Sequence, residues 1–66
     1  MHAVFKDSDE RVVDSRVDIH LEQPASWLRT SDEATVCEVY EDAGAVRGEL
    51  VVTFVREAKS GRWRKK

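Results

Sequence analysis

The clearest pattern along the chain is an alternation of apolar and polar positions over residues 13–22. One side of an extended chain would carry Val13, Ser15, Val17, Ile19 and Leu21, and the other Asp14, Arg16, Asp18, His20 and Glu22. A period of two predicts a strand with one buried and one wet face. Residues 1–6 predict an earlier strand, joined to it by a polar turn at 7–11. We expect Phe5 opposite Val13, since a one-residue slip would send Phe5 to the polar side.

Residues 31–43 carry two conflicting patterns. Thr30 followed by Glu33 fits a helix-capping box, and a Gly at position 44 fits a helix C-terminus. Between them, apolar residues recur at helical spacing. The segment 35–40 is nevertheless rich in strand-forming residues. We expect a helix, because the start and stop signals agree; the alternative is a strand.

The remaining segments predict short elements. Pro24 ends the second strand because it lacks an N–H, and residues 25–29 predict one helical turn or an extended connection. Residues 49–55 are apolar on both sides, which indicates a central strand. A turn at Gly61 precedes a last short strand at 62–64.

These elements define a small α+β fold, an antiparallel sheet with one helix in ββαββ order. If 31–43 is a strand, the alternative is an all-β five-stranded small barrel. The ten Val, against three Leu and one Ile, favour strands in either case.

Length and composition exclude several classes of protein. The 66 residues predict a single domain, 1–66, with 64–66 expected as a frayed basic tail. A core of this size supplies at most about 3–5 kcal/mol of net stability, which leaves little for a catalytic cleft, so we expect no enzyme. One Cys excludes an intramolecular disulfide, and no apolar run approaches the roughly 20 residues of a membrane span. We therefore expect a cytoplasmic protein without a membrane partner.

The net charge of −2 is unevenly divided. Residues 1–46 hold four basic and eleven acidic side chains, giving −7, whereas residues 47–66 hold seven basic and two acidic, giving +5. Such asymmetry selects charged partners.

The leading hypothesis is a non-enzymatic protein that binds and modulates or inhibits a protein partner with a basic surface, of which a nucleic-acid-binding protein is one example. Small inhibitors from phages or mobile elements would fit this mode of action. The acidic face would comprise Asp14, Asp18, Glu22, Asp32, Glu38, Glu41 and Asp42, with Trp27 or Tyr40 as the apolar anchor. The simpler explanation is that these carboxylates keep a small domain soluble.

The second hypothesis is nucleic-acid binding by the basic C-terminal hairpin, in which cations contact phosphates and Trp63 stacks on a base. Its residues are Arg56, Lys59, Arg62, Trp63, Arg64, Lys65 and Lys66. Against it, the arginines could lie over Trp63 or pair with Glu57. A third hypothesis is a subunit or homodimer formed through an open sheet edge, if the last strand is short.

The side chains that could bind a metal ion do not have the spacing of a zinc or calcium site. His2, His20 and Cys37 match no zinc motif. The acidic stretch 7–10 lacks the glycine and the distal Glu of a calcium loop. We expect no catalytic residue, no metal and no cofactor.

Overall fold

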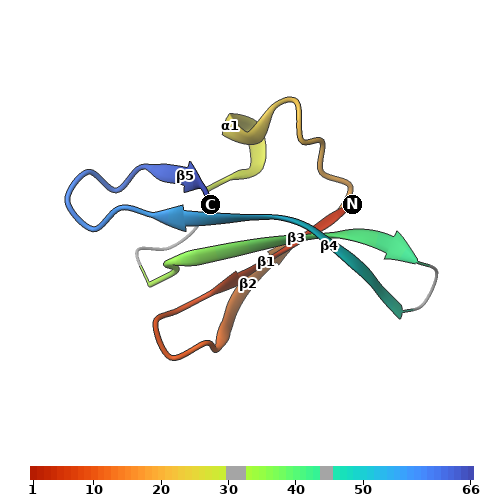
Figure 1. Ribbon diagram of the computed structural model, residues 1–66, viewed down its shortest axis with the longest axis horizontal. Coiled ribbons are helices and arrows are strands. Elements are labelled where there is room, and N and C mark those ends of the chain that lie inside the picture. Colours follow the sequence, from red (N-terminus) through yellow and green to blue (C-terminus); the bar gives the residue numbers. More distant parts are fainter. Residues whose placement is uncertain (30–32, 44–45) are drawn as a thin grey trace.

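The structure is a computed structural model that describes residues 1–29, 33–43 and 46–66. One antiparallel sheet and one short helix make up the fold (Figure 1). Along the chain the elements are β1 (His2–Lys6), β2 (Val12–Arg16), α1 (Pro24–Trp27), β3 (Val36–Ala43), β4 (Val46–Arg56) and β5 (Trp63–Lys65). In the sheet the strands follow the order β2-β1-β3-β4-β5.

The predicted ββαββ fold is wrong, because residues 36–43 form the central strand β3 and not a helix. β3 is hydrogen-bonded on both sides, to β1 and to β4. Cys37 and Val39 are fully buried, whereas Glu38 between them is only half-buried. This alternation has the period of a strand. The all-β alternative is closer to the structure. Thr30 and Gly44, which suggested the helix ends, lie outside the described residues.

The expected pairing of Phe5 with Val13 is also wrong. A β-bulge follows Phe5, so that Lys6 lies opposite Val12 and Phe5 lies opposite Asp14. An extra residue in one strand shifts the register in this way. The long alternation predicted for 13–22 ends early, since β2 stops at Arg16 and Asp18 has a φ of 55°.

The shifted register places two charged residues of β2 on the same side of the sheet as Phe5. Asp14 and Arg16 pair with each other at 2.7 Å. The Arg16 guanidinium also lies 5.7 Å from the centre of the Phe5 ring and donates to the Arg29 carbonyl at 2.8 Å. Asp14 and Arg16 therefore lie at the rim of the core, and both charged groups have interaction partners there.

The core lies on the inner side of a strongly curled sheet. Phe5 of β1 and Trp63 of β5 are in edge-to-face contact, with ring centres 5.8 Å apart, although β3 and β4 separate their strands in the sheet. The connection from β2 to β3 covers this inner side and contributes Ile19, Trp27 and Ala34 to the core.

Candidate nucleic-acid interface

The β4–β5 hairpin carries the densest group of like charges in the chain. We call residues 56–66 the basic hairpin; its charged members are Arg56, Lys59, Arg62, Arg64, Lys65 and Lys66, with Glu57 as the single carboxylate. Its turn is closed by backbone hydrogen bonds from Glu57 to Arg62 and from Gly61 to Glu57, both of 2.8 Å. Gly61 has a φ of 71°, which glycine adopts without strain. The turn leaves Lys59 and Arg62 exposed.

Trp63 holds the basic hairpin onto the core. The Trp63 ring is in edge-to-face contact with the Phe5 ring, and the Arg56 guanidinium lies 4.8 Å from the centre of the Trp63 ring. The side chain is half-buried. The Arg56 guanidinium lies over the Trp63 ring, on a surface that a nucleic-acid base would need for stacking. Trp63 therefore anchors the hairpin in this conformation.

Glu57 stabilises the turn of the basic hairpin through two side-chain contacts. It accepts a hydrogen bond from the Ser60 hydroxyl at 2.9 Å and pairs with Arg64 at 2.8 Å. These two contacts, the Ser60 hydrogen bond first, hold the pKa of Glu57 below its ordinary value. Two of the six cations are thus engaged within the hairpin, Arg56 over the Trp63 ring and Arg64 with Glu57. Lys59, Arg62, Lys65 and Lys66 are exposed.

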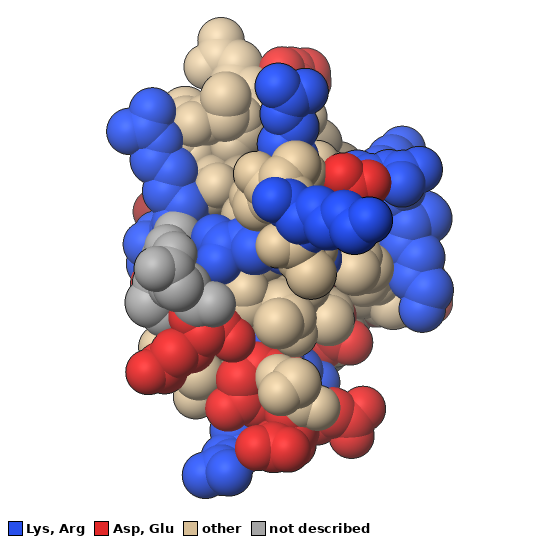
Figure 2. Space-filling model, turned by 90° about the vertical axis from the view of Figure 1, so that its left-hand side faces the viewer, with Lys and Arg blue, Asp and Glu red and all other residues tan. Residues whose placement is uncertain are grey.

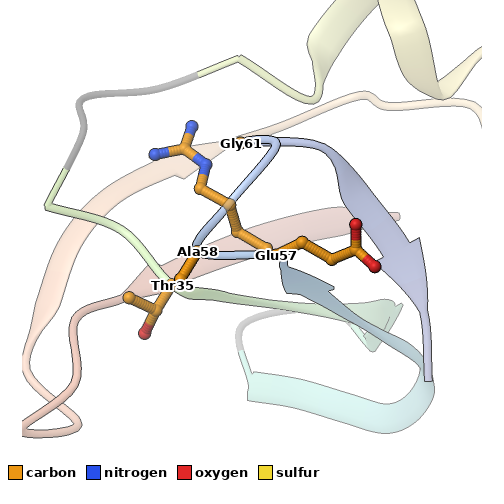
Figure 3. A pocket seen from close by; sticks show the side chains of 5 residues that line it. Thr35, Glu57, Ala58 and Gly61 are labelled. Atoms are coloured by element: carbon orange, nitrogen blue, oxygen red, sulfur yellow. The ribbon is translucent and has the colours of Figure 1, made fainter.

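Two hollows flank the basic hairpin. A pocket of about 440 Å³ is lined by Thr35, Arg56, Glu57, Ala58 and Gly61. In Figure 3, Thr35 and Ala58 lie next to each other while the Glu57 side chain points away from them. A hollow of about 280 Å³ is lined by Val55, Arg56, Glu57, Arg64, Lys65 and Lys66. Sequence reasoning missed Thr35, because no sequence pattern links it to a hairpin that begins 21 residues further on, at Arg56.

The charge division seen along the sequence is also a division in space. Figure 2 shows the end of the molecule that carries the β1–β2 and β4–β5 turns. Lysine and arginine side chains cover much of its upper part, and acidic side chains gather below them. The β1–β2 turn contributes exposed carboxylates at Asp9 and Glu10. At this end of the molecule, most basic and most acidic side chains therefore gather on different parts of the surface.

The structure distributes the predicted acidic face over both sides of the sheet. Asp14 lies opposite Phe5, whereas Glu38 lies opposite Val4. Since Val4 and Phe5 are neighbours in one strand, the two carboxylates point to opposite sides. Asp18, Glu22 and Glu41 are exposed, and Asp32 lies outside the described residues.

Several of these carboxylates are already paired within the chain. Glu38 contacts the Lys6 ammonium at 2.8 Å and accepts a hydrogen bond from the Tyr40 hydroxyl at 3.1 Å. Asp42 lies 2.9 Å from His2 Nδ1 and 3.0 Å from the Met1 amine. The His2 contact, followed by the amine, lowers the pKa of Asp42, and the Glu38 hydrogen bond raises that of Lys6.

The two expected apolar anchors are held inside the fold. Trp27 is 7% exposed, and its indole N–H donates to the His20 carbonyl at 2.8 Å. Tyr40 is half-buried and stacks on His2, with ring centres 5.6 Å apart. Binding through the acidic face stays a prediction, now without an exposed aromatic side chain at its centre.

In the described part of the chain, no three His, Cys, Asp or Glu side chains are grouped to hold a metal ion. No helix in the same residues is long and apolar enough to cross a membrane. Comparison with protein families, with curated proteins and with solved structures finds no match to the chain.

Proposed function

We propose that this chain is a small, non-enzymatic binding module that contacts the phosphate backbone of double-stranded nucleic acid through the basic hairpin. The observation that carries the proposal is the grouping of six cations and one carboxylate on a single ordered hairpin. Electrostatic contact with phosphates needs closely spaced, exposed cations and no sequence-reading element.

The burial of the aromatic side chains favours duplex over single strands. Single-strand binding relies on exposed rings on which bases stack. The chain has five aromatic side chains, two Trp, one Tyr and two Phe, and each is buried or half-buried. Trp63, the one aromatic residue of the basic hairpin, has the Arg56 guanidinium over one face of its ring. Phosphate contacts made by the exposed cations of the hairpin are then the main source of affinity.

Charge reversal on the hairpin tests this proposal. The Lys59→Glu, Arg62→Glu double variant should bind a labelled duplex at least about tenfold more weakly than the native chain at low salt, measured by fluorescence anisotropy. Both residues are exposed, so the fold should be kept, as circular dichroism can verify.

Arg11→Glu is the matched control. Arg11 is an equally exposed arginine in a turn, but it lies in the acidic β1–β2 turn and pairs with Asp9 at 3.1 Å. Its reversal should change duplex affinity by less than about twofold. Because Arg11→Glu changes the net charge by half as much as the double variant, a loss half as large on a logarithmic scale would show a response to net charge alone. A native chain that binds no oligonucleotide at low salt would refute the proposal.

A further inference from the structure

Part of β4 has no neighbouring strand on the side where β5 lies. β4 spans Val46–Arg56, but β5 pairs with Phe54–Arg56, and the Lys66 N–H extends this contact to the Thr53 carbonyl at 2.8 Å. Among the described residues, no other strand pairs with this side of β4. Residues 46–52 therefore form an open edge, and the backbone groups of such an edge can pair with an added strand.

The opposite edge of the sheet, on β2, is blocked by its own side chains. The Asp14 carboxylate accepts a hydrogen bond from the Ser15 N–H at 2.8 Å, and the Arg16 guanidinium donates to the Ser15 carbonyl at 2.9 Å. Side chains that occupy the backbone groups of an edge protect it from pairing with another chain. An added strand would therefore join β4 and not β2.

An apolar pocket lies beside the open edge, where β5 ends. Its volume is about 240 Å³, and its lining comes from β4, β5 and the connection between β2 and β3: Leu21, Pro24, Val51, Val52, Phe54 and Lys65. Val51 is 40% exposed. When a peptide adds a strand to a sheet edge, pockets that receive its side chains give specificity. This pocket can receive an apolar side chain of the added strand.

The charges beside the pocket favour an acidic strand. Lys65 lines the pocket, Lys66 follows it, and both are exposed. Their ammonium groups suit carboxylates next to the apolar side chain. A second copy of this chain does not provide these carboxylates. Glu49 is the middle residue of the edge, so antiparallel pairing of two copies about a two-fold axis would bring the two Glu49 residues together and set the lysines of each copy towards Arg47 of the other.

We propose that the open edge of β4 binds an extended acidic peptide of another protein. The peptide runs antiparallel to β4, as both strands that pair with β4 do. Backbone hydrogen bonds to residues 46–52 hold it, one apolar side chain enters the pocket beside Val51, and carboxylates that precede this side chain pair with Lys65 and Lys66. These two lysines also belong to the basic hairpin, but the peptide site needs no nucleic acid, so the two proposals can fail separately.

Binding of a synthetic peptide to the native chain, without nucleic acid, is the first measurement. The probe is acetyl-Glu-Glu-Val-Thr-Val-Thr with a fluorescent label at its C-terminus, and the control is the same peptide with both glutamates replaced by glutamine. Fluorescence anisotropy should give a Kd below about 1 mM for the probe and at least about fivefold weaker binding of the control. A probe Kd above about 1 mM, or equal binding of the two peptides, would overturn the proposal.

Charge-neutralising variants locate the carboxylates of the bound peptide. In the Lys65→Gln, Lys66→Gln variant, the glutamate and glutamine peptides should bind equally well. The matched control is Lys59→Gln, Arg62→Gln, which has the same net charge and should keep the preference for glutamate. All four side chains are exposed, so both variants should fold. Loss of the preference in both variants would show a response to net charge alone and would rule out a site beside the pocket.

Two valine variants test the use of the pocket. Val51→Gln should weaken binding of the glutamate peptide by at least about tenfold, because it places a polar side chain in the pocket lining. Val55→Gln should change binding by less than about twofold. Val55 is 37% exposed, close to the 40% of Val51, but it pairs with β5. Equal losses in the two variants would contradict binding at this pocket.

Methylation of the peptide backbone tests strand addition itself. The N–H groups of an extended peptide point alternately to its two sides, so N-methylation of every second residue removes the donors of one side. One of the two methylated peptides should lose binding, and the other should bind within about threefold of the unmodified probe. Equal effects of the two methylation patterns would refute pairing with the open edge.

Discussion

Replacing Trp63 by leucine separates a structural role for this side chain from a role in stacking on bases. Leucine keeps an apolar side chain at the start of β5 but removes the ring. The lost edge-to-face contact with Phe5, 5.8 Å between ring centres, is worth about 0.5–1.5 kcal/mol. The lost contact with the Arg56 guanidinium, 4.8 Å from the ring, is worth about 0.5–1 kcal/mol.

The smaller side chain also leaves unfilled space beside Phe5, so the total loss should be about 2–3 kcal/mol in the free energy of unfolding. A domain of this size has about 3–5 kcal/mol available, so the variant should remain mostly folded. Urea unfolding followed by circular dichroism measures the loss without relying on tryptophan fluorescence. Trp63→Phe, which keeps a ring, should lose less.

The same variant should bind oligonucleotides almost as well as the native chain. We expect its affinity for duplex and for single strands to change by less than about threefold under conditions where it is folded. If Trp63 stacked on a base, the loss would be about 1–3 kcal/mol of single-strand affinity. Unchanged stability together with such a loss of affinity would refute the structural role of Trp63.

Three further predictions concern stability and reactivity. A Cβ added at Gly48 would lie 2.3 Å from the Glu41 carbonyl oxygen, so Gly48→Ala should lower the free energy of unfolding by about 1–3 kcal/mol in urea titrations. Burial raises the pKa of Cys37 to about 12, so a thiol reagent at pH 8 should react about a hundredfold or more slowly with the folded chain than with the urea-unfolded chain; equal rates would contradict the burial. The pKa of Glu57 lies below its ordinary value of 4.5, so its contribution to stability is present above pH 4.5 and is lost as the pH falls through the lower, folded-state pKa. Glu57→Gln should therefore reduce the difference in thermal stability between pH 7 and pH 3, and an unchanged difference would show that the carboxylate is not coupled to folding.

The strands β1 and β4 and the β4–β5 turn could be predicted from the sequence because local signals agree there. Val-rich segments and Gly61 point to the same structure at each position. The strand β3 could not be predicted in this way, since Val36, Cys37 and Tyr40 fit the spacing of a helix as well as that of a strand. What decides between them is the pairing of β3 with both β1 and β4, which is a long-range property.

The register of β1 with β2 failed for a related reason. The bulge after Phe5 has no signature in the residues around it. The shifted register brings Arg16 to the rim of the core, where contacts with the Phe5 ring, Asp14 and the Arg29 carbonyl stabilise its charge. In the same way, the cations of the basic hairpin could be read from the sequence, but the engagement of Trp63 by Phe5 could not.

The most direct test of phosphate binding is the salt dependence of duplex affinity for the native chain. Besides Arg64, which pairs with Glu57, four cations of the basic hairpin are exposed: Lys59, Arg62, Lys65 and Lys66. If they contact about four phosphates, the logarithm of the binding constant should fall with the logarithm of salt concentration with a slope of about −3 to −4. The Lys59→Glu, Arg62→Glu variant should have a slope shallower by about 2. A slope near zero in the native chain would contradict the account.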